Sequence, residues 1–432
     1  MRILHTSDWH LGLLTGSGIS RGPEHARFLA WLAAEISARE VDTLLIAGDL
    51  FDSMQPSAEA QARYYGFLGG LGAGARGSLR QVVIVGGNHD SAARLDAPRD
   101  LLAALDIHVV GGLGDLTDPA ARYLVPLRGR GGEVEAVCLA VPYVNEFRLG
   151  VRGTDPDHTA MRREFTARFG ELYRRLTDEA RAIWPGLPLV ATGHLTLGPA
   201  TREDYPQEIH CVGQIESLPD TVLDPRLQYT ALGHIHRPYP VAGGRAWYSG
   251  SPVALTLPEA AVPRRVLCID LDPRPDGYAA VTPVEVPTFR ALRLLEGTPE
   301  ELVARARTLS WTEPMPPLVH ARARTDSWDP LLWNRLEEAL AAHAEGQRPL
   351  LVDLRLLRVG DRGVETPAAP VDLQELQPSE VFGALCASRG LTGGPAHEQA
   401  GLDKLRAAFA ALLAARGTSP ADLFQQMAGD LP

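Results

Sequence analysis

Short apolar runs alternate with glycine-containing turns and helix-like stretches through residues 1–285. Most of the runs are rich in valine, isoleucine and leucine without polar alternation, which is typical of strands covered on both faces. The predicted strands are residues 2–5, 43–47, 82–85, 136–141, 189–191, 229–232 and 266–271. Two longer stretches, residues 24–39 and 161–183, repeat apolar side chains at helical spacing and predict covering helices. The pattern predicts one α/β domain over residues 1–285.

A second, smaller pattern follows at residues 286–358. Strand-like runs at 290–295, 318–324 and 350–357 alternate with helix-like stretches at 299–309 and 331–344. This order predicts a small β-α-β-α-β domain. Residues 359–371 then contain Gly363, Pro367 and Pro370, which predict an extended linker.

The remaining residues, 372–432, have a helical pattern. Leu402, Leu405, Phe409 and Leu412 recur at intervals of three and four and form one apolar stripe. Two or three short helices beyond a linker make a poor independent core, so we expect the stripe to dock on a groove or coiled coil of another chain. The alternative is that these helices pack only on one another.

Composition supports a folded protein of two or three domains. The chain has 432 residues, of which 45% are hydrophobic and 22% charged, close to ordinary globular usage. Its formal net charge of −11 gives no overall electrostatic case for binding nucleic acid. No apolar run approaches the roughly 20 residues of a membrane span, and residues 1–8 lack the apolar core of a secretory signal.

The cysteines indicate a reducing compartment. Cys138, Cys211, Cys268 and Cys386 are scattered, with no pair at metal-binding or redox spacing. We therefore expect a cytoplasmic protein that does not contact a membrane.

Candidate chemistry lies at five of the predicted strand ends, where side chains able to bind a metal follow the last apolar residue. The endings are Asp8-Trp9-His10, Gly48-Asp49, Gly87-Asn88-His89-Asp90, Gly193-His194 and Gly233-His234-Ile235-His236. Because an open α/β sheet binds ligands beyond the carboxyl ends of its strands, we expect these groups to converge. Carboxylate, imidazole and amide oxygen together suit two divalent cations such as Mn²⁺, rather than a thiolate-rich structural zinc site.

Each ending taken alone has an ordinary explanation. A single Asp-x-His is more often a hydrogen-bonded loop, Gly48-Asp49 is a common turn, and His194 or His234 alone is more often a satisfied histidine at a strand end. All five endings occur in order, each at a predicted strand end, and this coincidence favours a metal centre.

The same segments resemble the calcineurin-like metallophosphoesterases and, within them, the SbcD nuclease subunits. The matching segments are MRILHTSDWHL (1–11), GDLFD (48–52), GNHDS (87–91), ATGHLT (191–196), ALGHIHR (231–237) and YSGSP (248–252). The resemblance implies layered β-sheets flanked by helices, with a small α/β capping domain and a C-terminal helical segment.

The resemblance also implies two cation sites. One cation would be bound by Asp8, His10, Asp49 and His236, and the other by Asp49, Asn88, His194 and His234. Asp49 would then bridge the pair, as a carboxylate can.

Two residues next to the ligands receive separate expectations. His89 is not used as a ligand and is expected to act as the general acid that protonates the leaving oxygen. Asp90 is expected either to orient a neighbouring ligand or to cap a helix. Asp52 stands where archaeal relatives often carry a histidine, so that histidine's role is not carried over.

The resemblance implies that the protein is a nuclease that depends on Mn²⁺, or on Mg²⁺ or another divalent cation. Its reactions would be 3′ to 5′ exonuclease action on double-stranded DNA ends and endonuclease action on hairpins and single strands, in DNA end processing, repair and recombination. Its implied partner is the SbcC ATPase, bound through residues 372–432, with two nuclease subunits and two ATPases in a heterotetramer.

Three alternatives remain at this point. Protein phosphatases use similar metals, but they typically carry Gly-Asp-x-x-Asp-Arg-Gly and Gly-Asn-His-Glu, where this chain has Ser53 after Asp52 and Asp90 after His89. A small-molecule phosphodiesterase would give no reason for the second domain. A scaffold that only recruits an ATPase is disfavoured by the intact ligand set.

Two further features have competing interpretations. Arginines and acidic residues interleave in the stretch 162–179, which favours a solvated mixed-charge helix face over a DNA track. Trp9 could shape the substrate path, or it could be a packed aromatic side chain.

Overall fold

The computed structural model describes residues 1–72, 79–114, 116, 119–151, 158–198, 217–325, 329–344, 346–357 and 409. The chain forms two compact units, Met1–Val359 and Gly360–Pro432. The predicted linker (359–371) and the predicted C-terminal helices (372–432) lie outside the described residues, apart from Phe409, which is helical. Among the described residues, no helix has both the length and the apolarity needed to cross a membrane.

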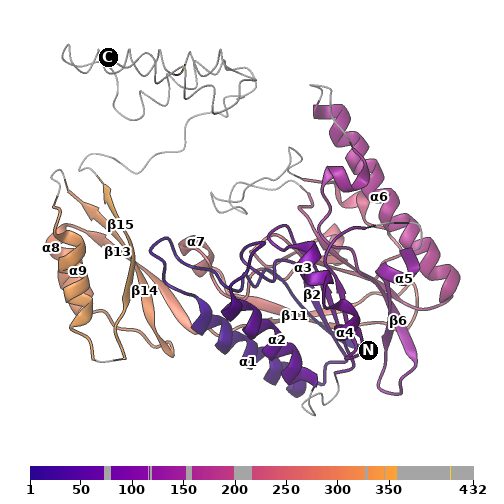
Figure 1. Ribbon diagram of the computed structural model, residues 1–432, viewed down its shortest axis with the longest axis horizontal. Coiled ribbons are helices and arrows are strands. Elements are labelled where there is room, and N and C mark those ends of the chain that lie inside the picture. Colours follow the sequence, from indigo (N-terminus) through magenta and orange to yellow (C-terminus); the bar gives the residue numbers. More distant parts are fainter. Residues whose placement is uncertain are drawn as a thin grey trace. The chain divides into compact units, whose positions relative to one another are not determined.

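The first unit contains two six-stranded sheets (Figure 1). The first sheet has the order β12-β11-β1-β2-β3-β4, in which β1 to β4 are parallel, β11 pairs antiparallel with β1, and β12 pairs antiparallel with β11. Its strands are β1 (Arg2–Thr6), β2 (Thr43–Ala47), β3 (Gln81–Val85), β4 (Ile107–Val110), β11 (Arg265–Asp270) and β12 (Ala280–Glu285). The second sheet has the order β5-β6-β7-β8-β10-β9. Its strands are β5 (Leu124–Arg128), β6 (Val134–Leu139), β7 (Leu189–His194), β8 (Tyr229–Gly233), β9 (Tyr239–Val241) and β10 (Ala246–Tyr248).

The two sheets share one apolar core. Alternate residues of the central strands, among them Ile3 and Leu45, pack toward the second sheet, while their neighbours Leu4 and Leu44 belong to a separate core on the other face. That other face is covered by α1 (Gly22–Ala38) and α2 (Ala58–Gly72). The helix α6 (His158–Ile183) packs against the second sheet. Shorter helices are α3 (Ala92–Asp96), α4 (Arg99–Ala103), α5 (Pro119–Tyr123) and α7 (Leu257–Ala260).

The layered sheets that the resemblance implies are confirmed, with the predicted strands β1, β2, β3 and β11 in one sheet and β6, β7 and β8 in the other. The sequence pattern missed several elements. They include α2, whose Gly66, Gly69 and Gly70 weaken its helical signal, the strands β4, β5 and β12, and the three-residue strands β9 and β10. Strands that short carry too few positions for a pattern to be read.

A three-stranded parallel sheet follows, in the order β13-β14-β15. Its elements are β13 (Arg290–Gly297), α8 (Pro299–Arg307), β14 (Met315–Arg324), α9 (Leu332–Ala341) and β15 (Leu350–Leu357), in the predicted order. A capping box between Thr298 and Glu301 begins α8. Leu302 and Leu336 of the two helices are buried against the sheet, so the amphipathic spacing of α8 and α9 determines this core.

The two six-stranded sheets, which pack face to face around their shared core, are called the sandwich below. Apolar contacts join the small sheet to this sandwich. Ala254 and Leu257, which lie before and within α7, pack with Leu292, Leu318 and Val352 of the small sheet.

Candidate metal centre

Five strand ends, three from the first sheet and two from the second, meet at one place. The predicted ligands there are Asp8 and His10 after β1, Asp49 after β2, Asn88 after β3, His194 at the end of β7, and His234 and His236 after β8. Several hydrogen bonds join the sheets at this point, among them two that involve the backbone. His194 Nδ1–H donates to the carbonyl oxygen of Ala47 at 2.9 Å, and the His234 backbone N–H donates to Asp8 Oδ1 at 2.8 Å.

A first group of ligand atoms comes from Asp8, His10 and His236, and these atoms lie within 4.8 Å of one another. His10 Nε2 is 3.2 Å from His236 Nε2 and 3.7 Å from Asp49 Oδ2. Two imidazole nitrogens and a carboxylate oxygen therefore face the same small space.

A second group comes from Asp8, Asp49 and His194, within the same 4.8 Å limit. His194 Nε2 is 3.2 Å from Asp49 Oδ2 and 2.9 Å from Asn88 Oδ1. Asn88 Oδ1 is also 3.0 Å from His234 Nδ1. Asp49 Oδ2 thus lies between the two groups, and Asp8 takes part in both, whereas the resemblance gives Asp8 to one cation only.

The backbone at these positions is strained. Asp8, His10, Asp49 and His234 have φ values of 54°, 48°, 50° and 91°, in the left-handed region that non-glycine residues rarely adopt. Such conformations cost on the order of 1–3 kcal/mol each and persist where the surrounding fold enforces them. Here the rigid ends of two packed sheets enforce them.

Glycines allow the close approach of the ligands. A Cβ on Gly48, which has a φ of 92°, would lie 2.2 Å from His194 Nδ1. A Cβ on Gly87 would lie 2.1 Å from Asp49 Oδ1. Any side chain at either position would displace a ligand.

Charges in the site are concentrated around Asp49. Burial acts against ionisation of this carboxyl, but the charge of His194 and its hydrogen bond hold the pKa of Asp49 well below its usual range. Burial likewise opposes charge on the histidines, but hydrogen bonding and charge from Asp52 and Asp49 raise the pKa of His10 to about 9. Asp49 outweighs burial in the same way at His194 and raises its pKa to about 9. The centre therefore favours positive charge around the Asp49 carboxylate.

Burial has the dominant effect on two other ligands. It raises the pKa of Asp8, and it lowers the pKa of His234 to about 3, with the charge of His194 adding to the latter effect. His234 is thus a neutral imidazole, the form that binds metals.

His89 lies beside the first group, and with His10 and Asp52 it forms a third set whose possible ligand atoms lie within 4.8 Å of one another. Its ring is 4.9 Å from the His10 ring, and its Nδ1–H donates to the carbonyl oxygen of Asp52 at 2.9 Å. The carboxylate of Asp52 lies 3.4 Å from His10 Nδ1. The carbonyl bond fixes the ring of His89 and leaves Nε2 available for proton transfer.

Asp90 holds the loops that carry the ligands. Its carboxylate accepts hydrogen bonds from the backbone N–H groups of Leu50 (3.1 Å), Phe51 (3.0 Å) and Gly87 (2.9 Å). Burial raises the pKa of Asp90 to about 6, with the charge of Asp49 acting in the same direction. The helix-capping alternative is wrong, because the residue at the N-terminus of α3 is Ser91 and it has no side-chain cap.

The two remaining sequence features lie outside the chemistry. Trp9 is fully buried, contacts Phe28 and Phe67 edge to face, and donates to Thr6 Oγ1 at 2.9 Å, so it is a packed aromatic residue. On α6, Arg174 pairs with Glu171 and Asp178, as the mixed-charge interpretation predicts.

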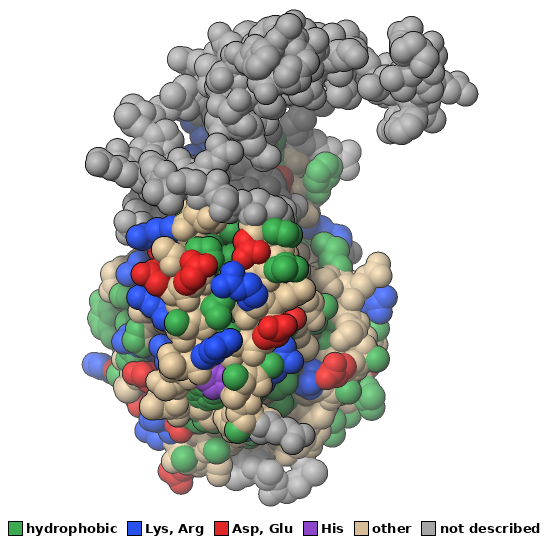
Figure 2. Space-filling view, turned by 90° about the vertical axis from the view of Figure 1, so that its left-hand side faces the viewer, with side chains coloured by type: hydrophobic (Ala, Val, Ile, Leu, Met, Phe, Trp, Pro, Cys, Tyr) green, Lys and Arg blue, Asp and Glu red, His purple; other side chains and the backbone are tan. Residues whose placement is uncertain are grey.

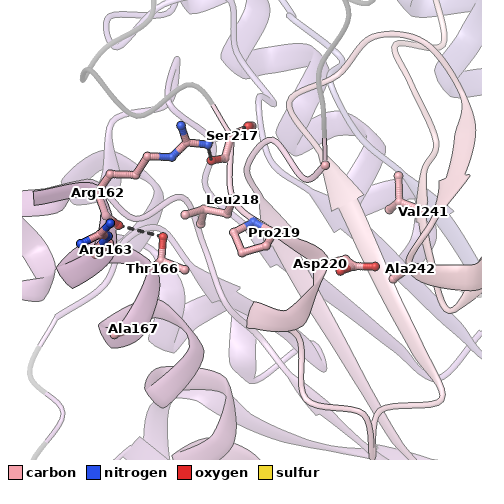
Figure 3. Close-up of a pocket in the computed structure, with 11 residues that line it drawn as sticks. Arg162, Arg163, Thr166, Ala167, Ser217, Leu218, Pro219, Asp220, Val241 and Ala242 are labelled. Atoms are coloured by element: carbon pink, nitrogen blue, oxygen red, sulfur yellow. Dashed lines mark hydrogen bonds between the residues drawn. The ribbon is translucent and has the colours of Figure 1, made fainter. Parts of the chain in front are cut away.

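A separate cavity of about 970 Å³ lies at the start of α6 (Figure 3). Arg162, Leu218, Pro219 and Val241 contribute to its lining, together with seven further residues, none of which is a predicted metal ligand. Arg162 Nη2 donates to the Ser217 carbonyl oxygen at 3.0 Å.

The sequence pattern missed residues that hold the ligands from a distance. Ser7 Oγ donates to Asp8 Oδ2 and is 2.7 Å from Ser249 Oγ. Glu259 Oε1 is 3.3 Å from His236 Nδ1. Ser249 lies in the YSGSP segment, which is one of the segments that resemble the family, so the sequence could have indicated a role for it. No motif includes Glu259.

The donor set fits divalent cations. Neighbouring ligands bonded at about 2.1 Å to a hard or borderline cation are about 3 Å apart. The contacts between nitrogen and oxygen ligand atoms here span 2.9 to 3.7 Å. Imidazole nitrogens, carboxylate oxygens and an amide oxygen are all present, and no cysteine is among the groups.

Comparison with known proteins agrees with this geometry. The sequence profile of the calcineurin-like phosphoesterases matches residues 1–238, more than half of the chain. The chain belongs to the calcineurin-like phosphoesterase family. The candidate centre of this phosphoesterase has the donor atoms that metal-dependent hydrolysis of a phosphoester requires.

Its relatives within the family are SbcD proteins, the D components of SbcCD nucleases. It is 40% identical over 280 residues to the SbcD protein of Rhodobacter capsulatus, covering 63% of this chain and 66% of the relative. It is 31% identical over 310 residues to the SbcD protein of Escherichia coli K12, covering 71% and 73%. The Bacillus subtilis SbcD protein is 33% identical over 276 residues, covering 63% and 67%. The phosphoesterase is thus a member of the SbcD family, although the first match spans just under two thirds of that relative.

Proposed function

We propose that the chain is the nuclease subunit of an SbcCD-type complex and hydrolyses DNA phosphodiesters with two divalent cations, Mn²⁺ in preference to Mg²⁺. The observation that carries the proposal is the position of Asp49 Oδ2, 3.7 Å from His10 Nε2 and 3.2 Å from His194 Nε2. One carboxylate oxygen lies between two sets of ligands, as a bridging ligand must.

The ligands divide between two cations as follows. Asp8, His10, Asp49 and His236 would hold one, and Asp49, Asn88, His194 and His234 would hold the other. The contact of 3.2 Å between His10 and His236 supports the first set. The contacts of Asn88 Oδ1 with His194 and His234, at 2.9 and 3.0 Å, support the second.

Bound divalent cations supply Lewis acidity, which activates a water and offsets the negative charge that develops on the phosphate. The residues of the chain provide the geometry. Asp49 and Asp8 balance positive charge at the centre, and Asp90 keeps the two ligand loops at a fixed separation through its backbone hydrogen bonds. Little reorganisation is then needed during reaction.

His89 is the proposed general acid. Its Nδ1–H donates to the Asp52 carbonyl oxygen, so the acid is the imidazolium form, which carries a second proton on Nε2; it gives that proton to the leaving oxygen and becomes the neutral imidazole. The backbone N–H of His89 also donates to Asp49 Oδ1 at 2.9 Å. The acid is therefore fixed relative to the bridging carboxylate.

The test is cleavage by the purified full-length chain in Mn²⁺ and, separately, in Mg²⁺. The substrates are end-labelled linear duplex DNA, hairpin DNA, a generic phosphodiester such as bis(p-nitrophenyl) phosphate, and a phosphopeptide. We expect release of nucleotides from 3′ ends and opening of hairpins, faster in Mn²⁺. Hydrolysis of the generic diester or the phosphopeptide without cleavage of DNA would indicate a different phosphoesterase.

We also propose an SbcC-type ATPase as partner, bound through residues 372–432 in an assembly of two nuclease and two ATPase subunits. The net charge of −11 leaves this chain weakly suited to hold DNA alone. Acidic and basic side chains are interspersed on the described face around α8 and α9, with no continuous basic area in that view (Figure 2). The partner would then supply much of the grip on DNA.

Deleting residues 372–432 tests this assignment. The truncated chain should keep its Mn²⁺-dependent cleavage but fail to co-purify with the ATPase and show no stimulation by ATP. A stable complex formed by the truncated chain would place the docking site elsewhere.

A further inference from the structure

Glu259 is a buried carboxylate that no sequence motif includes. It lies in α7, is 8% exposed, and is 23 residues away in sequence from His236, whose ring it contacts. Few carboxylates are buried to this extent without a specific partner.

The contact sets the hydrogen-bonding state of His236. Glu259 Oε1 is 3.3 Å from His236 Nδ1, while His236 Nε2 is 3.2 Å from His10 Nε2 in the first ligand group. An ionised carboxylate only accepts hydrogen bonds, so Nδ1 carries the proton and donates to it. The lone pair of the imidazole is then on Nε2, which faces the candidate cation position.

The other ligand histidines have different partners. His194 Nδ1–H donates to the backbone carbonyl of Ala47. His10 Nδ1 lies 3.4 Å from the Asp52 carboxylate. His236 also has a carboxylate as its partner, which increases the basicity of the opposite nitrogen more than a carbonyl does.

Glu259 is itself fixed in place. Its Oε2 accepts from the Leu255 backbone N–H at 2.9 Å, and its Oε1 accepts from Thr256 Oγ1 at 3.1 Å. Arg264, which is 7% exposed, lies 3.9 Å from Glu259 and donates to the carbonyl oxygen of His236 at 2.8 Å. Both the ring and the backbone of His236 are thereby held by this segment.

The segment is anchored on its other side by the small sheet. Leu257, two residues before Glu259, packs with Leu292, Leu318 and Val352. The orientation of Glu259 therefore depends on packing between the sandwich and the small sheet.

We propose that Glu259 is a positioning residue that fixes the tautomer and orientation of His236, so that Nε2 binds one of the two cations. The inference rests on the proposed two-cation function. It predicts that changes at Glu259 affect one cation site and leave the other intact.

The test is Mn²⁺ titration of the full-length chain by calorimetry, with electron paramagnetic resonance of the bound ions. Glu259→Gln should weaken one of two sites about 10- to 100-fold and reduce the signal of the coupled ion pair in favour of that of a single ion. Glu259→Asp, which keeps the charge but shortens the side chain, should lose less affinity. The comparison variant is Thr256→Val, which removes one hydrogen bond to Glu259 but leaves the contact with His236 and the bond from the Leu255 backbone N–H. It should weaken the same site much less than Glu259→Gln does.

Wild-type affinity at both sites in Glu259→Gln would overturn the inference while leaving the two-cation centre in place. Equal weakening by Thr256→Val and Glu259→Gln would assign Glu259 to loop stability alone and would also overturn it. If the wild-type chain fails to bind two ions, the metal centre itself is refuted, and the role of Glu259 with it.

Discussion

The sandwich and the small three-stranded sheet are built from the same kinds of element but use their strand ends differently. In the sandwich, strand ends carry buried charged side chains on a strained backbone, with Asp8, His10 and Asp49 in left-handed conformations. In the small sheet, over 290–325, 329–344 and 346–357, no non-glycine residue has a positive φ. Its interior is an apolar layer between the sheet and two amphipathic helices.

The difference shows what a metal centre requires of its fold. Three or four strained residues, at on the order of 1–3 kcal/mol each, need a large core to offset their cost. The two stacked sheets provide that core on both sides of β1, β2 and β3. The small sheet has a core under its two helices and a second, smaller apolar cluster of Leu292, Leu318 and Val352, which packs against the segment around α7.

The largest expected effect is from Asp49→Asn in the sandwich. Replacing the bridging charge should lower the rate of cleavage by at least about 10²- to 10³-fold and weaken both cation sites. Calorimetric titration with Mn²⁺ checks this, with Asn88→Ala as the matched variant of a ligand assigned to one site. Equal losses of affinity in the two variants would remove the case for bridging.

His89→Ala should lower the rate at least about 10²-fold, because a general acid is lost, while two Mn²⁺ ions remain bound. Metal content and cleavage can be measured on the same preparation. A near wild-type rate would show that His89 does not transfer the proton.

Leu336→Ala should have the opposite pattern of effects. It should lower the stability of the protein and leave metal binding and catalysis unchanged. Leu336 is 1% exposed in the core of the small sheet, so its truncation should cost about 2–5 kcal/mol of unfolding free energy. Leu331→Ala is the control, because Leu331 is 61% exposed and should cost within about 0.5 kcal/mol. Chemical denaturation gives both values. Mn²⁺ affinity below the melting temperature should be unchanged in both variants, and a loss in Leu336→Ala would couple the small sheet's core to the centre.

The most gradual effect is an acid sensitivity of the two-sheet region, which develops over several pH units. Burial, with the charge of Arg21, lowers the pKa of His25 to about 3, and burial lowers the pKa of His5 to about 3. The unfolded chain takes up these protons near pH 6.5 and the folded chain does not, so stability is lost as pH falls from about 6.5 toward 3. Each histidine contributes at most about 1.4 kcal/mol per pH unit.

Thermal melts of the metal-free protein between pH 7 and pH 4 measure this loss. His25→Leu should make the fall in melting temperature shallower than in the wild type. An unchanged slope would mean that His25 gains a proton without unfolding.

Much of the candidate centre could be predicted from local sequence. The ligands follow apolar runs directly, so Asp49 after β2 and His194 at the end of β7 could be read from the strand pattern. The order of elements from β13 to β15 was readable for the same reason, because α8 and α9 have clear amphipathic spacing.

Interactions between distant residues could not be predicted in this way. Ser7 contacts Ser249 across 242 positions, and Glu259 contacts His236 from a segment with no motif. The sequence around either residue does not predict its contact with the other, because such contacts depend on how the intervening elements pack.

The sequence by itself determined which side chains end the strands, where glycine must precede them, and that carboxylate, imidazole and amide donors were available for divalent cations. These are properties of neighbouring residues, set by hydrophobic periodicity and donor chemistry. Only the tertiary structure decided that β1 to β3 and β7 to β8 belong to different sheets and that their ends meet. Only the packed sheets place Asp49 Oδ2 between His10 and His194 and hold its backbone in a left-handed conformation. That arrangement depends on side chains far apart in sequence filling one shared core, which no local pattern encodes.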